Sequence, residues 1–262
     1  IVNEEVDVII GGPPCQAYSL ANRGNKFNKP DDYRNFLFES FIEVLTCFKP
    51  KFFVFENVTG MLSAKPGGTA VKDRIFEAFD KAGYEVLHPN EMKEAVFSAV
   101  DFNVPQKRKR VILIGINKTK INSSLFMLKS MYQQLESRKS DNVKTVKDAI
   151  FNLPKLSEQH DNANSADQSH QRRYHSTRDT DIFREWVSND MNRRSSEEKI
   201  QFYKERVGKN TKVSKYRNLE WDKPAPTIVA HLYKDGLLFI HPDALQARSI
   251  SVREAALLQS FP

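Results

Sequence analysis

The chain has 262 residues, enough to bury a sizeable core as one large domain or two smaller ones. No apolar run approaches the roughly 18 residues that span a bilayer, and the first 20 residues lack a signal-peptide pattern, so we expect a soluble, intracellular protein. With only Cys15 and Cys47, a disulfide framework and a cysteine-rich zinc site are excluded.

The net charge of +7 is unevenly distributed along the chain. Residues 118–215 contain 20 basic and 13 acidic residues, so the remainder is neutral. A local excess of positive charge predicts a polyanionic partner such as nucleic acid. A solvated basic surface is the alternative interpretation.

Apolar runs alternate with amphipathic segments over the first 117 residues. Helical spacing of apolar residues predicts helices over 33–48, which includes Cys47 as a core residue, and over 71–82, before the helix stop Gly83. The order strand, helix, strand, helix, strand predicts a parallel sheet with helices on its faces. The expected buried strands are Val6–Ile10, Phe52–Phe55, Tyr84–Leu87 and Val111–Ile116.

The chain beyond residue 117 is polar and less periodic. Within 118–215, only Val146–Leu156 and Ile182–Val187 suggest short elements. Residues 224–229 read as extended, and Ser251 precedes Glu254 by three residues, which predicts a capped helix at 251–259.

The stretch GGPPCQAYSL (residues 11–20) follows the first predicted strand. Ligands of open α/β sheets bind beyond the carboxyl ends of strands, and glycine and proline allow a close, rigid backbone approach there. We therefore expect Cys15 to be presented at the mouth of a crevice. A tight turn with a small buried thiol is the alternative.

Glu56 ends the second predicted strand, at the same edge of the sheet. Its carboxyl group would share the crevice with Cys15 in a partly apolar setting, where a carboxyl can hold a proton and donate it. A helix cap or a surface acid is the competing interpretation.

The third feature is the basic run PQKRKR at 105–110, which leads into a predicted strand. Alternation places Gln106, Arg108 and Arg110 on one face and the two lysines on the other. A charged edge strand is the alternative. Together, a thiol, an acid and guanidinium groups suit the addition of a thiolate to an electron-poor ring such as cytosine. The acid would contact a ring nitrogen and a guanidinium group the carbonyl oxygen.

Four blocks in this order resemble the motif series of the cytosine-5 DNA methyltransferases: GGPPCQAYSL, the ENV triplet at 56–58, QKRKR at 106–110 and RSISVREAALLQSFP at 248–262. The resemblance implies an α/β fold with an incomplete doubly wound, Rossmann-like methyltransferase sheet and a smaller, irregular target-recognition domain. It divides the chain into a partial catalytic domain (1–117), a target-recognition region (118–215) and a hinge segment with the start of the return to the catalytic domain (216–262).

The resemblance implies that Cys15 adds to carbon 6 of a flipped-out cytosine, so that carbon 5 can accept a methyl group from S-adenosylmethionine. Glu56 is similar to the family's contact to ring nitrogen 3, Arg110 to its contact to oxygen 2, and Arg108 to its supporting arginine. Asn57 would order the Pro-Cys loop, and Thr227 resembles a contact to the DNA backbone.

The remaining implied contacts lie in the same blocks. Those to substrate are the carbonyl of Pro14, Val58, and a closing loop at 16–34 with Gln16, Ser19, Asn22, Arg23 and Gly24. Those to the cofactor are Pro13, Pro14 and Leu37, and no metal is expected. The arginines expected to read guanine edges are Arg172, Arg173, Arg178, Arg193 and Arg194.

Two family motifs are missing from these residues: the Phe-x-Gly-x-Gly turn and the closing Gly-Asn motif, both of which contact the cofactor. We therefore expect most of the S-adenosylmethionine site to lie outside this chain, on flanking residues, a truncated part or a complementing subunit, and these 262 residues alone to be inactive. The implied setting is a bacterial restriction-modification system acting on double-stranded DNA in the cytoplasm, at the nucleoid. A catalytically silent DNA-binding relative and a transfer-RNA methyltransferase are the alternatives.

Overall fold

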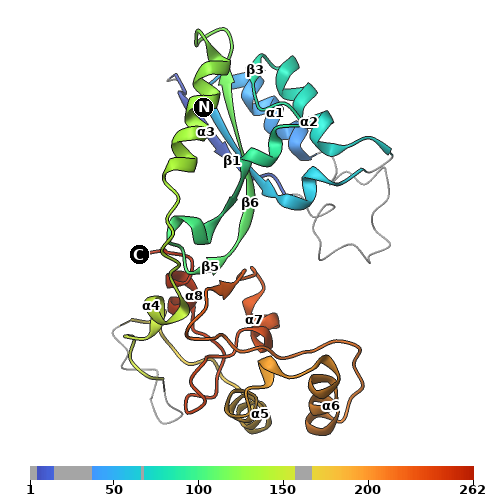
Figure 1. Ribbon diagram of the computed structural model, residues 1–262, viewed down its shortest axis with the longest axis vertical. Helices are drawn as coiled ribbons and strands as arrows, with labels where there is room; N and C mark the ends of the chain where they lie inside the picture. Colours follow the sequence, from blue (N-terminus) through green and yellow to red (C-terminus); the bar gives the residue numbers. More distant parts are fainter. Residues whose placement is uncertain (1–4, 15–36, 66–67, 157–166) are drawn as a thin grey trace. The chain divides into compact units, whose positions relative to one another are not determined.

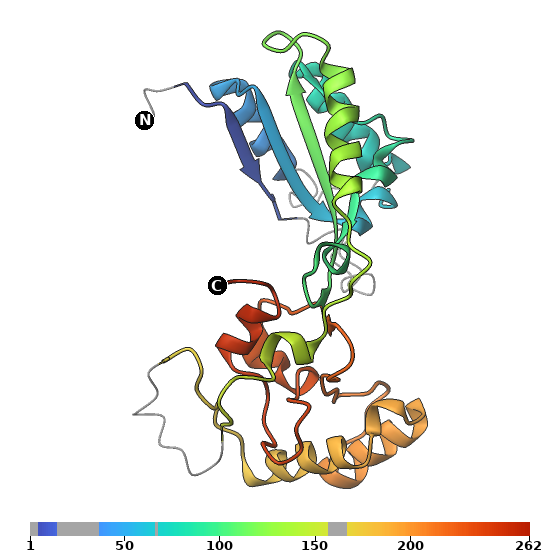
Figure 2. The ribbon, with the colours of Figure 1, turned by 60° about the vertical axis from the view of Figure 1, so that its left-hand side comes forward.

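The computed structural model describes residues 5–14, 37–65, 68–156 and 167–262. These form two compact units (Figures 1 and 2). Unit 1 comprises the chain up to Ser98 together with Lys109–Lys139, and unit 2 comprises Ala99–Arg108 together with Ser140–Pro262. The chain therefore changes unit after residues 98, 108 and 139, which are not the positions 117 and 215 expected from composition.

Unit 1 is built on a mixed sheet with the order β1-β2-β6-β3 and with β4 also paired to β6. Its strands are β1 (Val8–Gly11), β2 (Phe52–Val58), β3 (Tyr84–Glu85), β4 (Val96–Ser98) and β6 (Lys109–Asn117).

The expectation of a wholly parallel sheet is wrong. The strands joined through helices, β1, β2 and β3, do run in one direction, but β6 lies antiparallel between β2 and β3. No helix crosses over before β6, because the chain returns through β4, which pairs antiparallel with β6.

Helices α1 (Leu37–Phe48) and α2 (Val71–Lys81) confirm the two predicted helices over their described residues. Their apolar faces meet β2, where Phe41 and Phe79 make edge contacts with the ring of Phe55. Phe53 lies over Gly115 of β6, where a Cβ would come within 1.9 Å of the ring. Cys47 faces solvent, so its prediction as a core residue is wrong.

Helix α3 (Ser124–Ser137), which the sequence analysis missed, packs against β6. The hydroxyl of Tyr132 donates to the carbonyl of Ile112 and accepts from the amide of Ile114. The hydroxyl thus satisfies backbone hydrogen-bonding groups of β6 in the stretch that pairs with neither β4 nor β3. Because Leu128 and Tyr132 are buried against the sheet, residues 118–139 belong to unit 1.

Unit 2 consists mainly of short helices around two apolar clusters. Val146, Ile150, Leu219, Phe239 and Leu258 belong to the first, and Phe183, Trp186 and Tyr216 to the second. A parallel pair of two-residue strands, β5 and β7, completes it. Its helices and strands are α4 (Val146–Ile150), α5 (Thr177–Ser188), α6 (Ser196–Val207), α7 (Leu232–Asp235), α8 (Val252–Leu257), β5 (Gln106–Lys107) and β7 (Ala225–Pro226).

Short 3-10 turns lie at Thr59–Leu62, Met92–Ala95, Ala99–Phe102, Met191–Arg193 and Gly236–Leu238. The predicted capped helix near residue 251 is confirmed: Ser251 and Glu254 form a reciprocal capping box at the start of α8. In the part of the chain that the structure describes, no helix is long and apolar enough to cross a bilayer.

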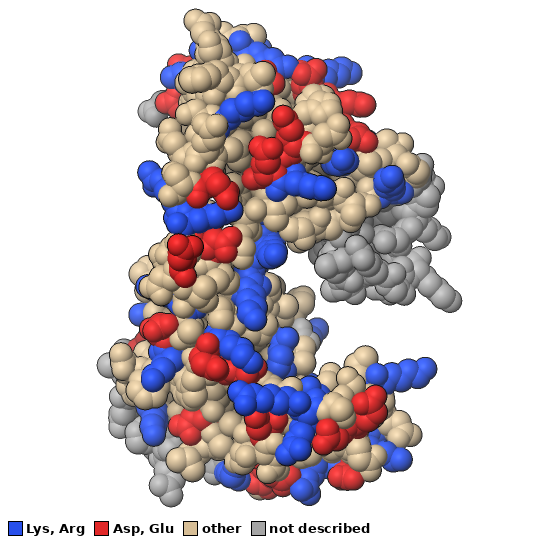
Figure 3. Space-filling model, viewed as in Figure 1, with Lys and Arg blue, Asp and Glu red and all other residues tan. Residues whose placement is uncertain are grey.

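The excess positive charge of residues 118–215 is divided between the two units. Residues 118–139, which carry five basic residues and one acidic residue, lie in unit 1. On the face drawn in Figure 3, basic and acidic side chains are interspersed over both units. Net charge alone therefore does not separate a nucleic-acid-binding unit from the other.

Candidate active site

Glu56 and Arg110 converge at the carboxyl end of β2. In the antiparallel register, Glu56 pairs with Ile112 and Arg110 with Val58, so both side chains project from the same face of neighbouring strands. Arg110 Nε lies 2.9 Å from Glu56 Oε1. The Arg110 and Glu56 side chains are 22% and 37% exposed, respectively, so the pair is accessible from solvent.

The glycine-proline segment lies beside this pair. A Cβ at Gly12 would come within 3.0 Å of Glu56 Oε2, so glycine lets the backbone pass the carboxylate closely. The amide of Asn57, which is only 4% exposed, donates to the Pro13 carbonyl at 3.4 Å, and its Oδ1 accepts from the amide of Val58 at 2.8 Å. The segment that leads to Cys15 is thus held at the end of the sheet.

Cys15 itself lies outside the described residues. So do the other predicted residues of the closing loop, Gln16, Ser19, Asn22, Arg23 and Gly24.

The position of Glu56 in its strand differs from the predicted one. Strand β2 continues through Val58, so Glu56 lies within the strand. The apolar side chains Phe53 and Phe55 alternate onto the opposite face, so the Glu56 carboxylate has a guanidinium partner and access to solvent. Within the described residues, the Glu56 carboxylate is thus paired with a charged group, and the partly apolar setting stays a prediction.

The basic run is split between the two units. Gln106 and Lys107 form β5 in unit 2, whereas β6 of unit 1 begins at Lys109. Gln106 is fully buried, and its side-chain amide donates to the carbonyl of Leu258. Arg108 belongs to unit 2, where its carbonyl accepts from the amide of Ala99 at 2.8 Å. The prediction of one continuous strand presenting Gln106, Arg108 and Arg110 on one face is wrong.

Thr227 contacts the basic run, although the two are 120 residues apart in the chain. Its hydroxyl donates to the carbonyl of Lys107 at 2.6 Å, next to the pairing of β5 with β7. Residue types and spacing alone gave no sign of this contact, because it depends on pairing between two-residue strands.

The residues that are predicted to contact the cofactor have apolar side chains. Pro13 and Leu37 are half-buried, and Pro14 is exposed. These residues can pack against an adenosyl group, but their side chains offer no hydrogen bond to it.

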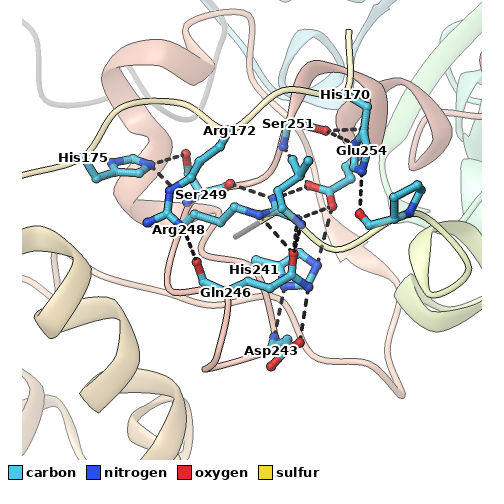
Figure 4. A network of polar contacts seen from close by, with 12 residues as sticks. His170, Arg172, His175, His241, Asp243, Gln246, Arg248, Ser249, Ser251 and Glu254 are labelled. Carbon is cyan, nitrogen blue, oxygen red and sulfur yellow. Dashed lines mark hydrogen bonds and ion pairs between the residues drawn. The ribbon is translucent and has the colours of Figure 1, made fainter. Parts of the chain in front are cut away.

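A buried polar network in unit 2 went unnoticed in the sequence (Figure 4). Arg248 and Glu254, each 1% exposed, form two hydrogen bonds of 2.7 Å. Gln246 Oε1 accepts from Arg248, and Ser251 donates its amide to Glu254. The spacing Arg-x5-Glu before a helix is the signal that could have suggested it.

Two histidines of this network are held neutral. Burial, and then the charge of Arg248, lower the pKa of His241 to about 4. Burial, and then the charges of Arg173 and Arg172, lower the pKa of His175 to about 4. The pKa of Glu254 lies below its usual value, because the hydrogen bonds and charge of Arg248 outweigh the effect of burial. The histidines therefore add no charge to the network, at whose centre Arg248 and Glu254 form a buried ion pair.

The arginines predicted to read bases differ in their partners. Arg172 donates to the carbonyls of Gln246 and Ala247, which commits its guanidinium to the fold. Arg173 donates to the carbonyl of Leu232. The other three form exposed ion pairs, which water and phosphate can readily replace: Arg178 with Asp179, Arg193 with Asp190, and Arg194 with Glu198.

Comparisons with known proteins agree on one family. The family model for C-5 cytosine-specific DNA methylases matches residues 1–262. Type II methyltransferase M.Bpa9945I of Bacillus paralicheniformis is 37% identical over 98% of this chain and 63% of its own length. Type II methyltransferase M1.HphI of Haemophilus parahaemolyticus is 34% identical over 100% of this chain and 61% of its own.

The chain thus spans somewhat less than two thirds of these relatives. Among solved structures, it is similar to one described as a DNA modification methyltransferase encoded within a prophage of E. coli. That match has a TM-score of 0.56 and 25% identity and covers 99% of this chain and 70% of the other. The α/β fold, the motif order and these matches place this chain in the family of C-5 cytosine-specific DNA methylases.

Proposed function

We propose that this chain carries the base-modifying and DNA-reading parts of an enzyme that methylates carbon 5 of a cytosine within a short DNA sequence. The observation that carries the proposal is the Glu56–Arg110 pair, in which an acid and a guanidinium 2.9 Å apart lie beside the segment Gly12–Pro14. Cys15 follows directly in the sequence. A nucleophile, a proton donor and an oxyanion contact are the three groups that addition to cytosine needs.

In the proposed reaction, the thiolate of Cys15 forms a bond to carbon 6 of the flipped-out base. Glu56 hydrogen-bonds ring nitrogen 3, and Arg110 binds oxygen 2, so the charge that develops on the ring is stabilised. When bound, S-adenosylmethionine would supply the methyl group to carbon 5 and leave as S-adenosylhomocysteine. Loss of the carbon 5 proton to a base then expels the thiolate and restores the aromatic ring.

The ion pair prepares both groups for this task. Arg110 Nη1 also donates to the carbonyl of Lys109 at 2.8 Å, so the guanidinium is oriented before the base arrives. An incoming cytosine would break the hydrogen bond between the pair: Arg110 would then bind oxygen 2, and Glu56 would take up a proton from solvent and donate it to ring nitrogen 3. Preorganised donors of this kind cost little reorganisation during the reaction.

The other predicted site residues keep supporting roles in the proposal. Asn57 holds the carbonyl of Pro13, which supports an ordering role for it. Thr227 would act on the DNA backbone close to the basic run that its hydroxyl already contacts. Of the rest, Pro14 and Val58 would contact the base, Pro13, Pro14 and Leu37 would pack against the cofactor, and Arg108 would serve as the supporting arginine.

Trapping on DNA that contains 5-fluorocytosine tests the proposal, since fluorine at carbon 5 prevents release of the thiolate. The full-length protein with S-adenosylmethionine should give a denaturation-resistant adduct, and Cys15→Ser should give none. Glu56→Gln and Arg110→Ala should slow adduct formation by about 10²- to 10⁴-fold.

The same assay separates the alternatives. A silent DNA-binding relative would give no adduct with the wild-type protein. A transfer-RNA methyltransferase would form it on RNA and not on duplex DNA. Bisulfite sequencing of DNA from cells that express the full-length gene would identify the methylated sequence.

A further inference from the structure

An exposed tyrosine lies in the middle of a firmly held segment of unit 2. Tyr174 is 88% exposed, the highest exposure among the large apolar or aromatic side chains of the described residues. It belongs to residues 170–176, here called the Tyr174 segment, which directly precede helix α5. Covering such a ring with a partner would remove apolar surface from water, so the ring is suited to a binding role.

The residues before Tyr174 are anchored. His170 Nδ1 lies 3.0 Å from Ser251 Oγ, and its Nε2 lies 2.9 Å from the carbonyl of Pro154. The guanidinium of Arg172 donates to the carbonyl of Gln246 at 2.9 Å. Figure 4 shows His170 and Arg172 pointing into the buried network.

The residues after Tyr174 are anchored as well. His175 Nε2 accepts from the amide of Ser249 at 3.2 Å and lies 3.0 Å from its hydroxyl. The His175 ring also makes an edge contact with Phe183 in the core. Ser176 caps α5 by accepting from the amide of Asp179. The backbone at Tyr174 is thus fixed from both sides, while its ring stays in solvent.

Fixing the backbone has a consequence for binding. A tyrosine has two rotatable side-chain bonds, so little conformational entropy remains to be lost when its ring is covered. A rigid, exposed aromatic side chain is therefore an efficient contact residue.

The charge around Tyr174 indicates the partner. Three arginines lie near Tyr174 in the chain: Arg172 is committed to the fold, Arg173 donates to the Leu232 carbonyl, and the exposed Arg178 pairs with Asp179. An aromatic ring can contact the edges of bases in a groove, while neighbouring guanidinium groups neutralise phosphates. An acidic protein surface would suit the charge but would make less use of a flat ring.

We propose that Tyr174 is a specificity-determining residue of unit 2, which packs its ring against the edge of a base of the DNA target, as apolar side chains do with the methyl group of thymine, while the anchored segment fixes its position. The inference rests on the proposed function, because it requires DNA as the substrate. It assigns to Tyr174 a role in choosing the sequence and none in the chemistry of methyl transfer.

Binding to two duplexes tests this inference. One duplex carries the sequence identified by bisulfite sequencing, and the other differs from it by one base pair. For the full-length protein, Tyr174→Ala should weaken binding to the first duplex by about 10-fold or more and weaken binding to the second much less. Tyr174→Phe should bind like wild type, because the ring is retained. Phe126→Ala is the matched control, since Phe126 is a 78% exposed aromatic residue of α3 in unit 1, and it should change neither affinity.

Equal binding of both duplexes by Tyr174→Ala and wild type would overturn the inference, and so would an equal loss on both duplexes or a loss in Tyr174→Phe. Adduct formation on 5-fluorocytosine DNA separates this failure from failure of the proposed function. A wild-type protein that forms the adduct, with Tyr174→Ala unchanged in discrimination, refutes the role of Tyr174 alone. A wild-type protein that neither binds DNA nor forms the adduct refutes both.

Discussion

The Glu56–Arg110 pair of unit 1 and the Arg248–Glu254 pair of unit 2 are both ion pairs between a glutamate and an arginine. Their surroundings are opposite. The first is 37% and 22% exposed and joins strands that are far apart in the chain. The second is 1% exposed at both ends and joins residues six apart.

The difference indicates what each pair can do. A buried charge needs its partner at all times, because removal from water is costly, so Arg248 and Glu254 serve the fold. An accessible pair contributes little to stability, and its partners can be exchanged for a ligand. Glu56 and Arg110 can therefore serve chemistry, although the residue types are the same.

The largest effect on stability is expected for Glu254→Gln. The substitution leaves the Arg248 guanidinium buried without its counter-charge, so the free energy of unfolding at pH 7 should fall by about 3–5 kcal/mol, measured by urea denaturation. Glu198→Gln is the matched control, because Glu198 holds the same capping-box position at the start of α6 but is 52% exposed. Equal losses in both variants would contradict the assignment of a structural role to the buried pair.

The second effect is a dependence of stability on pH. The pKa of His241 is about 4 in the folded protein, whereas that of an exposed histidine is 6.5, so the unfolded chain binds more protons between these values. Stability should therefore fall as pH is lowered from 6.5 to 4, by on the order of 3 kcal/mol for His241.

Urea denaturation at several pH values measures this slope. His241→Gln removes the titrating ring and should reduce the slope. Part of the slope should remain in this variant, because the pKa of His175 is lowered as well. Protonation of Glu254 should lower stability only at a more acidic pH than that of His241, because the pKa of Glu254 lies below its usual value. An unchanged slope in His241→Gln would show that the network does not hold this histidine neutral.

A smaller effect is expected at Thr227. Thr227→Val removes the hydrogen bond to the Lys107 carbonyl and should lower the free energy of unfolding by about 1 kcal/mol, whereas Thr227→Ser should retain it. Unchanged stability combined with weaker DNA binding in the valine variant would favour a role confined to the phosphate backbone.

The smallest effect on stability is expected for Glu56→Gln. Because the Glu56–Arg110 pair is accessible, the free energy of unfolding should change by less than about 1 kcal/mol. The rate of adduct formation on 5-fluorocytosine DNA should nevertheless fall strongly, because an amide cannot transfer a proton to ring nitrogen 3. A loss of stability comparable to that of Glu254→Gln would remove the contrast between the two pairs.

Local patterns predicted the helices near residues 37–48, 71–81 and 252–257, because periodicity and capping residues are written in neighbouring positions. They missed α3, although Leu128 and Tyr132 have helical spacing, since the exposed apolar residues Leu125, Phe126 and Met127 blur the contrast between its two faces. They also misjudged Cys47: its apolar neighbours Val44 and Phe48 are themselves partly exposed, so the apolar stripe of α1 is wider than its buried face.

The direction of β6 and the split of the basic run were beyond local patterns. Alternation describes which side chains share a face, but it does not tell which strand a segment pairs with or where it leaves a sheet. Lys109 starts a strand in one unit two residues after Lys107 ends a strand in the other.

The family, the order of the motif blocks and the placing of Glu56 and Arg110 in one site all follow from the sequence, because they depend on residue types at fixed positions along the chain. The accessibility of Glu56, the burial of Glu254, the antiparallel course of β6 and the hydrogen bond from Gln106 to the Leu258 carbonyl became visible only in three dimensions. Burial and strand direction arise from contacts between segments distant in the chain, and such contacts leave no periodic signal in either segment alone.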